Sequence, residues 1–122
     1  MIIRTSKENR ENVSVLTRKL NLGSENHIAR IALSYSLSNC EKLSLDHIEN
    51  SQGKEYSKSV FFGSNYELYI GMICLKYGIH SSDVDIPKYI KIHVDHGLKS
   101  LIDIVDKKNH NNGFDFIKEL VI

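Results

Sequence analysis

The chain has 122 residues and a formal net charge of +1, with 41% hydrophobic and 25% charged residues. These values fit one globular domain spanning residues 1–122. The sequence pI of about 7.8 excludes the strongly basic composition, with a pI above about 9, that is typical of nucleic-acid-binding domains. No apolar run approaches the roughly 20 residues that span a bilayer, and residues 1–9 lack a signal-peptide core. Two cysteines without CxxC spacing indicate reduced thiols, so we expect a cytoplasmic protein.

The first third of the chain predicts a short strand and two helices. Residues 2–5 favour a strand, Ser6 suits the N-cap of a helix over 7–20, and Gly23 suits a left-handed turn after it. A second helix is expected over 25–37. Its apolar residues cover so much of its girth that it should be central to the core or to an oligomer interface; they are Ile28, Ile31, Ala32, Leu33, Tyr35 and Leu37. This order of elements resembles a ribbon-helix-helix module, in which two chains pair their strands.

The rest of the chain predicts further helices after an irregular, polar stretch over 38–59. Val60 to Phe62 favours a short buried strand or extended segment. Helical spacing returns over 65–77 and again from about Pro87 to about Val105, with a turn over 107–113 and a short helix or strand over 114–122. The fold class is therefore mainly α, a compact helical domain with a short N-terminal strand and a ribbon-helix-helix-like start.

Several catalytic or metal-binding motifs are present only in part. Gly53-Lys54 fails as a phosphate-binding loop, because Ile48 occupies the position of the first glycine and Glu55 follows the lysine. His93 and His96 lie three residues apart without a second ligand pair, so a solvated helix face is favoured over a metal site. We expect no catalytic set, no cofactor and no metal.

An acidic cluster is the one feature that favours an enzyme. Asp83, Asp85 and Asp95 are the carboxylates that a metal-dependent nuclease would need, although two lie near a proline-containing loop and one lies on a predicted helix. A DNA-nicking nuclease therefore remains an alternative.

Basic residues are the stronger signal, since lysine and arginine neutralise phosphates and an aromatic ring among them can stack on a base. Tyr56 lies between two of the lysines, and interspersed glutamates favour the alternative of an ordinary mixed surface. The candidate DNA-binding residues are Arg4, Lys7, Arg10, Arg18, Lys19, Arg30, Lys54 and Lys58.

Four segments together resemble the DndE family of DNA sulfur-modification proteins: RTSKEN at 4–9, LTRKLNLGSENHIARIALSYSLS at 16–38, GKEYSKSVFFG at 53–63 and DIPKYIKIHVDHGL at 85–98. The resemblance covers about residues 2–102. It implies a small helical protein of the phosphorothioation system, which replaces a non-bridging phosphate oxygen of DNA with sulfur. It also implies a homo-oligomer such as a tetramer, binding to duplex and nicked DNA, and two partners, a sulfur-transfer subunit and an SMC-like ATPase.

The resemblance gives residues 53–63 two expected roles. Val60, Phe61 and Phe62 should anchor the segment in the core, Lys54 and Lys58 should contact phosphates, and the flanking glycines should let the chain turn. The predicted function is a non-enzymatic DNA-binding subunit of the phosphorothioation machinery. The alternatives are the nicking nuclease and a structural adaptor between the larger subunits.

Overall fold

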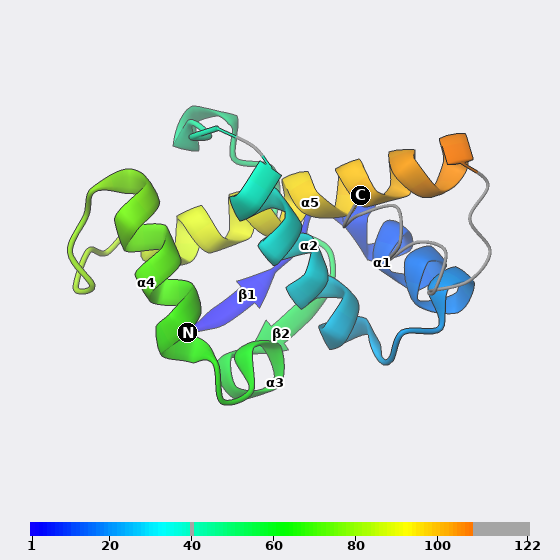
Figure 1. Ribbon diagram of the computed structural model, residues 1–122, viewed down its shortest axis with the longest axis horizontal. Helices are drawn as coiled ribbons and strands as arrows, with labels where there is room; N and C mark the ends of the chain where they lie inside the picture. The colour runs from blue at the N-terminus through cyan, green and yellow to red at the C-terminus, as the bar shows by residue number, and fades with distance from the viewer. Residues whose placement is uncertain (40, 109–122) are drawn as a thin grey trace.

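The computed structural model describes residues 1–39 and 41–108, and it is mainly helical with one short antiparallel sheet, which confirms the predicted fold class (Figure 1). The long helix α5 runs along the molecule, α2 crosses it, α1 lies towards one end and α4 towards the other. The elements in chain order are β1 (Ile2–Arg4), α1 (Lys7–Leu20), α2 (Glu25–Asn39), the 3-10 turn η1 (Leu45–His47), β2 (Glu55–Ser57), α3 (Lys58–Phe62), α4 (Tyr66–Tyr77) and α5 (Ile86–Lys108).

Helix α1 begins and ends through local hydrogen bonds. Ser6 is the N-cap, and its Oγ accepts from the backbone N–H of Asn9. At the other end Asn21 adopts the left-handed conformation, with φ of 52°, and its N–H donates to the carbonyl of Thr17. The left-handed residue that ends this helix is therefore Asn21 and not Gly23, because asparagine tolerates this conformation at little cost.

Strand β1 pairs within the chain, with β2. Ile2 lies opposite Ser57, Ile3 opposite Tyr56 and Arg4 opposite Glu55, in antiparallel register. This arrangement differs from a ribbon-helix-helix module, in which the first strand pairs with a second chain.

The segment from Lys58 to Phe62 is helix α3, so the expected buried strand at 60–62 is wrong. Ser57 caps this single turn, and its Oγ accepts from Val60 N–H. Phe61 and Phe62 are fully buried, whereas the side chain of Val60 is 51% exposed and does not anchor the segment. The reason is the helical turn, in which successive side chains are rotated by about 100°, so that Phe61 and Phe62 face the core while Val60 faces solvent.

The core is centred on the crossing of α2 and α5. Gly97 lies so close to α2 that a Cβ added to it would be 2.0 Å from the carbonyl oxygen of Ala32. Ile28, Ala32 and Leu33 are buried against this crossing. The apolar breadth of α2 is therefore explained by packing within one chain.

Helix α5 extends to Lys108, so the turn expected from residue 107 begins too early. The remainder of that turn and the closing segment over 114–122 lie outside the described residues. None of the helices in residues 1–39 and 41–108 has the length and apolar character that crossing a bilayer requires.

Candidate nucleic-acid interface

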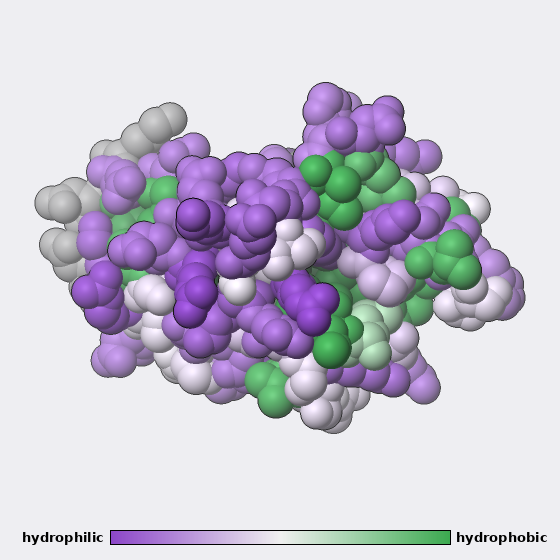
Figure 2. Space-filling view, turned by 180° about the vertical axis from the view of Figure 1, so that it is seen from behind, coloured by the Kyte–Doolittle hydropathy of each residue, from purple (hydrophilic) through white to green (hydrophobic). Residues whose placement is uncertain are grey.

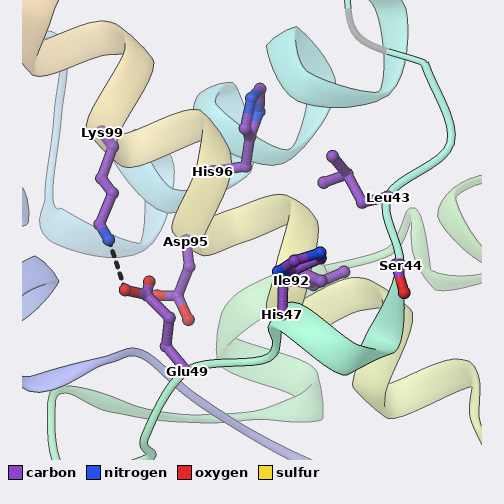
Figure 3. A pocket seen from close by; sticks show the side chains of 8 residues that line it. All are labelled: Leu43, Ser44, His47, Glu49, Ile92, Asp95, His96 and Lys99. Atoms are coloured by element: carbon purple, nitrogen blue, oxygen red, sulfur yellow. Dashed lines mark hydrogen bonds and ion pairs between the residues drawn. The ribbon is translucent and has the colours of Figure 1, made fainter.

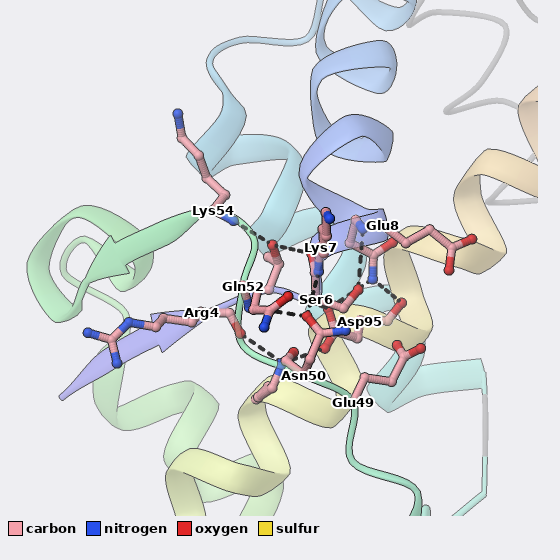
Figure 4. Close-up of polar contacts among 12 residues, drawn as sticks. Arg4, Ser6, Lys7, Glu8, Glu49, Asn50, Gln52, Lys54 and Asp95 are labelled. Carbon is pink, nitrogen blue, oxygen red and sulfur yellow. Dashed lines mark hydrogen bonds and ion pairs between the residues drawn. The ribbon is translucent and has the colours of Figure 1, made fainter.

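The backbones of three of the predicted basic residues lie close together where α1 begins, and the side chains of Arg4 and Lys54 point away from each other (Figure 4). Arg4 ends β1, Lys7 opens α1, and Lys54 lies in the segment that leads into β2 (Figure 4). The backbone N–H groups of Gly53 and Lys54 donate to the carbonyl and the Oγ1 of Thr5, at 2.9 Å and 2.8 Å. Thr5 N–H in turn donates to the carbonyl of Lys54 at 2.9 Å. We call Arg4, Lys7 and Lys54 the N-terminal basic edge.

Gly53 allows this close fit. A Cβ added to it would lie 2.1 Å from the carbonyl oxygen of Ser6 and 2.2 Å from Thr5 Oγ1. The glycine is thus required by the close approach of two backbones. Lys7 N–H donates to Asn50 Oδ1 at 2.9 Å, which fastens the same loop to the first turn of α1.

A buried ion pair on α5 holds the backbone of the basic edge. Lys91 Nζ lies 2.8 Å from Asp95 Oδ2 and also donates to the carbonyl oxygens of Arg4, at 3.0 Å, and Asn50, at 2.8 Å. Asp95 Oδ1 accepts from Ser6 N–H at 2.9 Å. Because one lysine and one carboxylate of α5 tie together the strand, the loop and the start of α1, the backbone that carries the edge cations is held in place.

This supporting pair was not predicted from the sequence. Lys91 and Asp95 are four residues apart, a spacing that places two side chains on one face of a helix. That spacing was the available signal, but such pairs are common on solvated faces, and only the fold shows that this pair is buried.

Two cations of the basic edge are paired with carboxylates at the surface. Arg4 Nη2 lies 3.3 Å from Glu55 Oε1, and Lys54 Nζ lies 3.2 Å from Glu25 Oε2. The Arg4–Glu55 pair is exposed on both sides, and pairs of this kind contribute typically about 0–1 kcal/mol, so a phosphate can replace Glu55 at small cost. Glu25 is 26% exposed and also accepts from Ser14 Oγ at 3.2 Å, so it is held more firmly. Lys7 is exposed and forms no ion pair within the described part of the chain.

The remaining basic residues of α1 lie in two places. Arg10 is exposed one turn after Lys7 and extends the basic edge along the helix. Arg18 and Lys19 lie in the last turn of the helix, roughly 17 Å from Lys7 along the helix axis at about 1.5 Å per residue. Lys19 Nζ is 3.8 Å from a carboxylate oxygen of Asp106. The structure does not bring these two residues to the edge.

Arg30 and Lys58 lie near α3, apart from the basic edge. Arg30 Nη2 donates to the carbonyl of Val60 at 3.3 Å, and Lys58 Nζ lies 3.8 Å from the ring centroid of Tyr66. Strand β2 separates Lys58 from Lys54. The two lysines of the segment GKEYSK therefore belong to different parts of the surface.

The acidic cluster considered for a nuclease does not assemble. Asp95 is buried in its pair with Lys91, and Asp85 precedes the start of α5, which lies roughly 14 Å along the helix axis from Asp95. Asp83 Oδ1 accepts from Asp85 N–H at 2.8 Å, which is a turn contact. No group of three His, Cys, Asp or Glu side chains in residues 1–39 and 41–108 is arranged to hold a metal ion.

The two histidines of α5 are not on a solvated face, so that interpretation is wrong. His93 is fully buried, and its Nδ1 lies 2.8 Å from Ser36 Oγ, which is also 3.0 Å from His96 Nδ1. Tyr77 OH contacts the other nitrogen of His93. Burial lowers the pKa of His93 to about 4, helped by the charges of Lys76 and His96. The fold places these imidazoles where α2, α4 and α5 meet.

A cavity of about 310 Å³ lies between the η1 segment and α5 (Figure 3). Leu43, His47 and Ile92 line it together with Lys99. The Lys99 ammonium donates to Glu49, which raises the pKa of Lys99. The Lys99 cation is therefore already paired with a carboxylate of the same chain. This makes the cavity less suited to binding an anion than the basic edge is.

The fold and the edge define a class of protein: a small helical domain with an intrachain strand pair and a basic edge at the start of α1. DndE from Escherichia coli B7A, whose crystal structure is described as that of a protein involved in DNA phosphorothioation modification, shares this fold. Its TM-score is 0.67 at 18% identity, over 82% of this chain and 94% of that chain. The family described as DNA sulphur modification protein DndE matches residues 2–110, and the chain belongs to the DndE family. No curated protein matches the sequence.

Proposed function

We propose that this chain is a non-enzymatic DNA-binding subunit of the machinery that makes phosphorothioate DNA. Membership of the DndE family supports the pathway. The N-terminal basic edge carries the proposed DNA contact, because the Lys91–Asp95 pair holds its backbone while its three cations face solvent or exchangeable carboxylates. The sulfur-transfer subunit and the SMC-like ATPase are its proposed partners.

The proposed contact is with the sugar–phosphate backbone. Arg4 and Lys54 exchange Glu55 and Glu25 for phosphate oxygens, and Lys7 adds a third cation at the positive end of α1. Such contacts position a protein on duplex DNA without reading its sequence. Since the chain has a net charge of only +1, one copy binds weakly and several copies on one DNA bind much more tightly.

The salt dependence of binding tests this contact. Lys7→Ala combined with Lys54→Ala should weaken duplex binding on unrelated sequences and lower the slope of log affinity against log salt by about two units per chain engaged, at about 0.9 per phosphate. The matched control is Lys42→Ala with Lys88→Ala, which removes two exposed lysines elsewhere and should leave the slope unchanged. Equal slopes for the wild type and the edge variant would remove the edge from the interface.

The role in modification is tested in the host. Deleting the gene should abolish iodine-sensitive phosphorothioate DNA, and the edge variant should restore less of it than the control variant. Unchanged modification in the deletion strain would overturn the assignment. Incubation of the purified protein with supercoiled plasmid and magnesium or manganese addresses the enzymatic alternative, and we expect no nicking.

We also propose that the chain forms a homo-oligomer, through α4 and not through α2. Ile28, Ala32 and Leu33 of α2 are buried within the chain, whereas Leu68 and Leu75 of α4 are 62% and 88% exposed. Hydrophobic patches gather towards the α4 end of the molecule on the face shown in Figure 2, beside a hydrophilic centre. Exposed apolar side chains on one element favour a protein interface.

A further inference from the structure

The outer side of α2 contains an open hollow of about 640 Å³. Helix α2 buries Ala29, Ala32 and Ser36 on the side that faces the core. The hollow lies on the opposite side, where α2 residues meet Tyr69 of α4 and the turn before α2. Arg4, Lys7 and Lys54 of the N-terminal basic edge are not among its lining residues, so the two surfaces can be changed by different substitutions.

Arg30 is the charged residue of this hollow and has unused hydrogen-bond donors. Its Nη2 donates to the carbonyl of Val60 at 3.3 Å, and its Nε is buried without a partner within the described residues, so the donors that a ligand can reach belong to the two Nη atoms. A guanidinium carries five N–H donors and binds a phosphate in a forked geometry. Among the described residues no carboxylate lines the hollow and Arg30 forms no ion pair.

The other polar side chains of the described residues that line the hollow carry imidazole, hydroxyl and amide groups. His27 Nδ1 accepts from Ser24 N–H at 3.2 Å. Ser34 Oγ and Tyr69 OH lie 3.3 Å apart and share a hydrogen bond. Imidazole, hydroxyl and amide groups beside one arginine suit a ligand that has one negatively charged group and other polar atoms.

We propose that this hollow binds one nucleotide unit, with its phosphate on Arg30 and its base against the half-buried ring of Tyr35. The volume lies within the range of about 300–1,000 Å³ that is usual for small-ligand sites. Aromatic stacking on a base does not require a particular sequence. This inference rests on the proposed function, because it takes the bound nucleotide to be an unpaired unit of a DNA strand.

The experiment measures binding of three probes to the full chain: thymidine monophosphate, a twelve-residue oligothymidylate and an intact duplex. Arg30→Gln removes the charge while Asn26 Nδ2 still donates to the carbonyl of Val60, and Ser38→Glu adds a carboxylate to the hollow. Each should weaken oligothymidylate binding about tenfold, as expected for one lost charged or stacked contact, and leave duplex binding unchanged. The matched control, Ser81→Glu, adds the same charge at an exposed position outside the hollow.

The outcomes separate this inference from the proposed function. Wild-type protein that binds duplex but not oligothymidylate, or variants that lose both equally, would overturn the hollow as a nucleotide site. Protein that binds no DNA but binds thymidine monophosphate in an Arg30-dependent way would assign the hollow to free nucleotides and refute the proposed function. Competition by a polyglutamate peptide as effective as that by oligothymidylate would indicate a protein carboxylate instead. Circular dichroism of each variant checks the fold.

Discussion

His93 is a buried imidazole whose surroundings favour its neutral form. Ser36 and Tyr77 hold its two nitrogens, and the nearby Lys76 and His96 add to the effect of burial, which lowers its pKa from 6.5 to about 4. The unfolded chain thus binds a proton at pH values where the folded chain does not. The free energy of unfolding should be unaffected above pH 6.5 and fall between pH 6.5 and 4 by on the order of 3 kcal/mol.

Urea unfolding as a function of pH measures this loss. His93→Gln should lower the free energy of unfolding at pH 7, because it changes the contacts of both ring nitrogens. Because glutamine cannot take up the proton, the stability of the variant should depend less on pH between 6.5 and 4. His80→Gln replaces an exposed histidine and should keep the wild-type profile. Wild-type pH dependence in the His93 variant would show that other groups cause the acid loss, and His96, whose pKa burial also lowers, would be the next residue to test.

Lys91 is the second residue whose environment makes a prediction. Its ammonium is 2.8 Å from Asp95 and bonds two carbonyl groups, and the side chains of the pair are 9% and 4% exposed. Lys91→Met should destabilise the fold by about 3–5 kcal/mol, because it leaves a buried carboxylate unpaired. Adding Asp95→Leu should recover part of that loss, and Lys88→Met is the exposed control. Thermal unfolding of Lys91→Met, the double variant and Lys88→Met measures these effects. A small loss of stability in Lys91→Met would show that other groups stabilise the buried Asp95 carboxylate.

At the scale of elements, the crossing of α2 and α5 depends on Gly97. A Cβ there would meet the Ala32 carbonyl oxygen at 2.0 Å and its carbon at 2.6 Å, which are backbone atoms that cannot swing aside. Gly97→Ala should cost roughly 1–3 kcal/mol or more through overpacking. Gly71→Ala is the matched control, since it lies in α4 with nothing within 4 Å of the added Cβ. It should be neutral or stabilising by up to about 1 kcal/mol.

The elements that were predictable are those with local signals. Ser6 marks the start of α1, helical spacing marks α2 and α4, and these were close to the observed bounds. The run Val60 to Phe62 was misread, because three apolar residues fit a buried strand and a single helical turn equally well. The register of β1 with β2 and the burial of Lys91 depend on contacts between distant parts of the chain, which no local pattern contains.

The whole molecule leaves apolar surface uncovered on α4. Leu75 is 88% exposed, and light scattering at tens of micromolar, a range where specific interfaces are populated, should show an oligomer. Leu75→Glu should shift the protein towards monomer, because a carboxylate at an apolar interface loses its hydration. Val60→Glu makes a comparable change at another exposed apolar position, on α3, and should leave the mass unchanged. A wild-type monomer, or equal dissociation by both variants, would contradict an interface at α4.

The pairing of β1 with β2 also sets an order of events during folding. Joining Ile2 to Ser57 closes a loop of more than fifty residues, at an entropic cost on the order of 3 kcal/mol. Helices form early because their hydrogen bonds join near neighbours in the chain. The entropic cost of this strand pair is offset only when the rest of the fold is in place. Substitutions at Ile3 should therefore speed unfolding and hardly slow folding. In a refolding experiment the helical signal should appear first and DNA affinity last, since Arg4 and Lys54 come together only with the final closure.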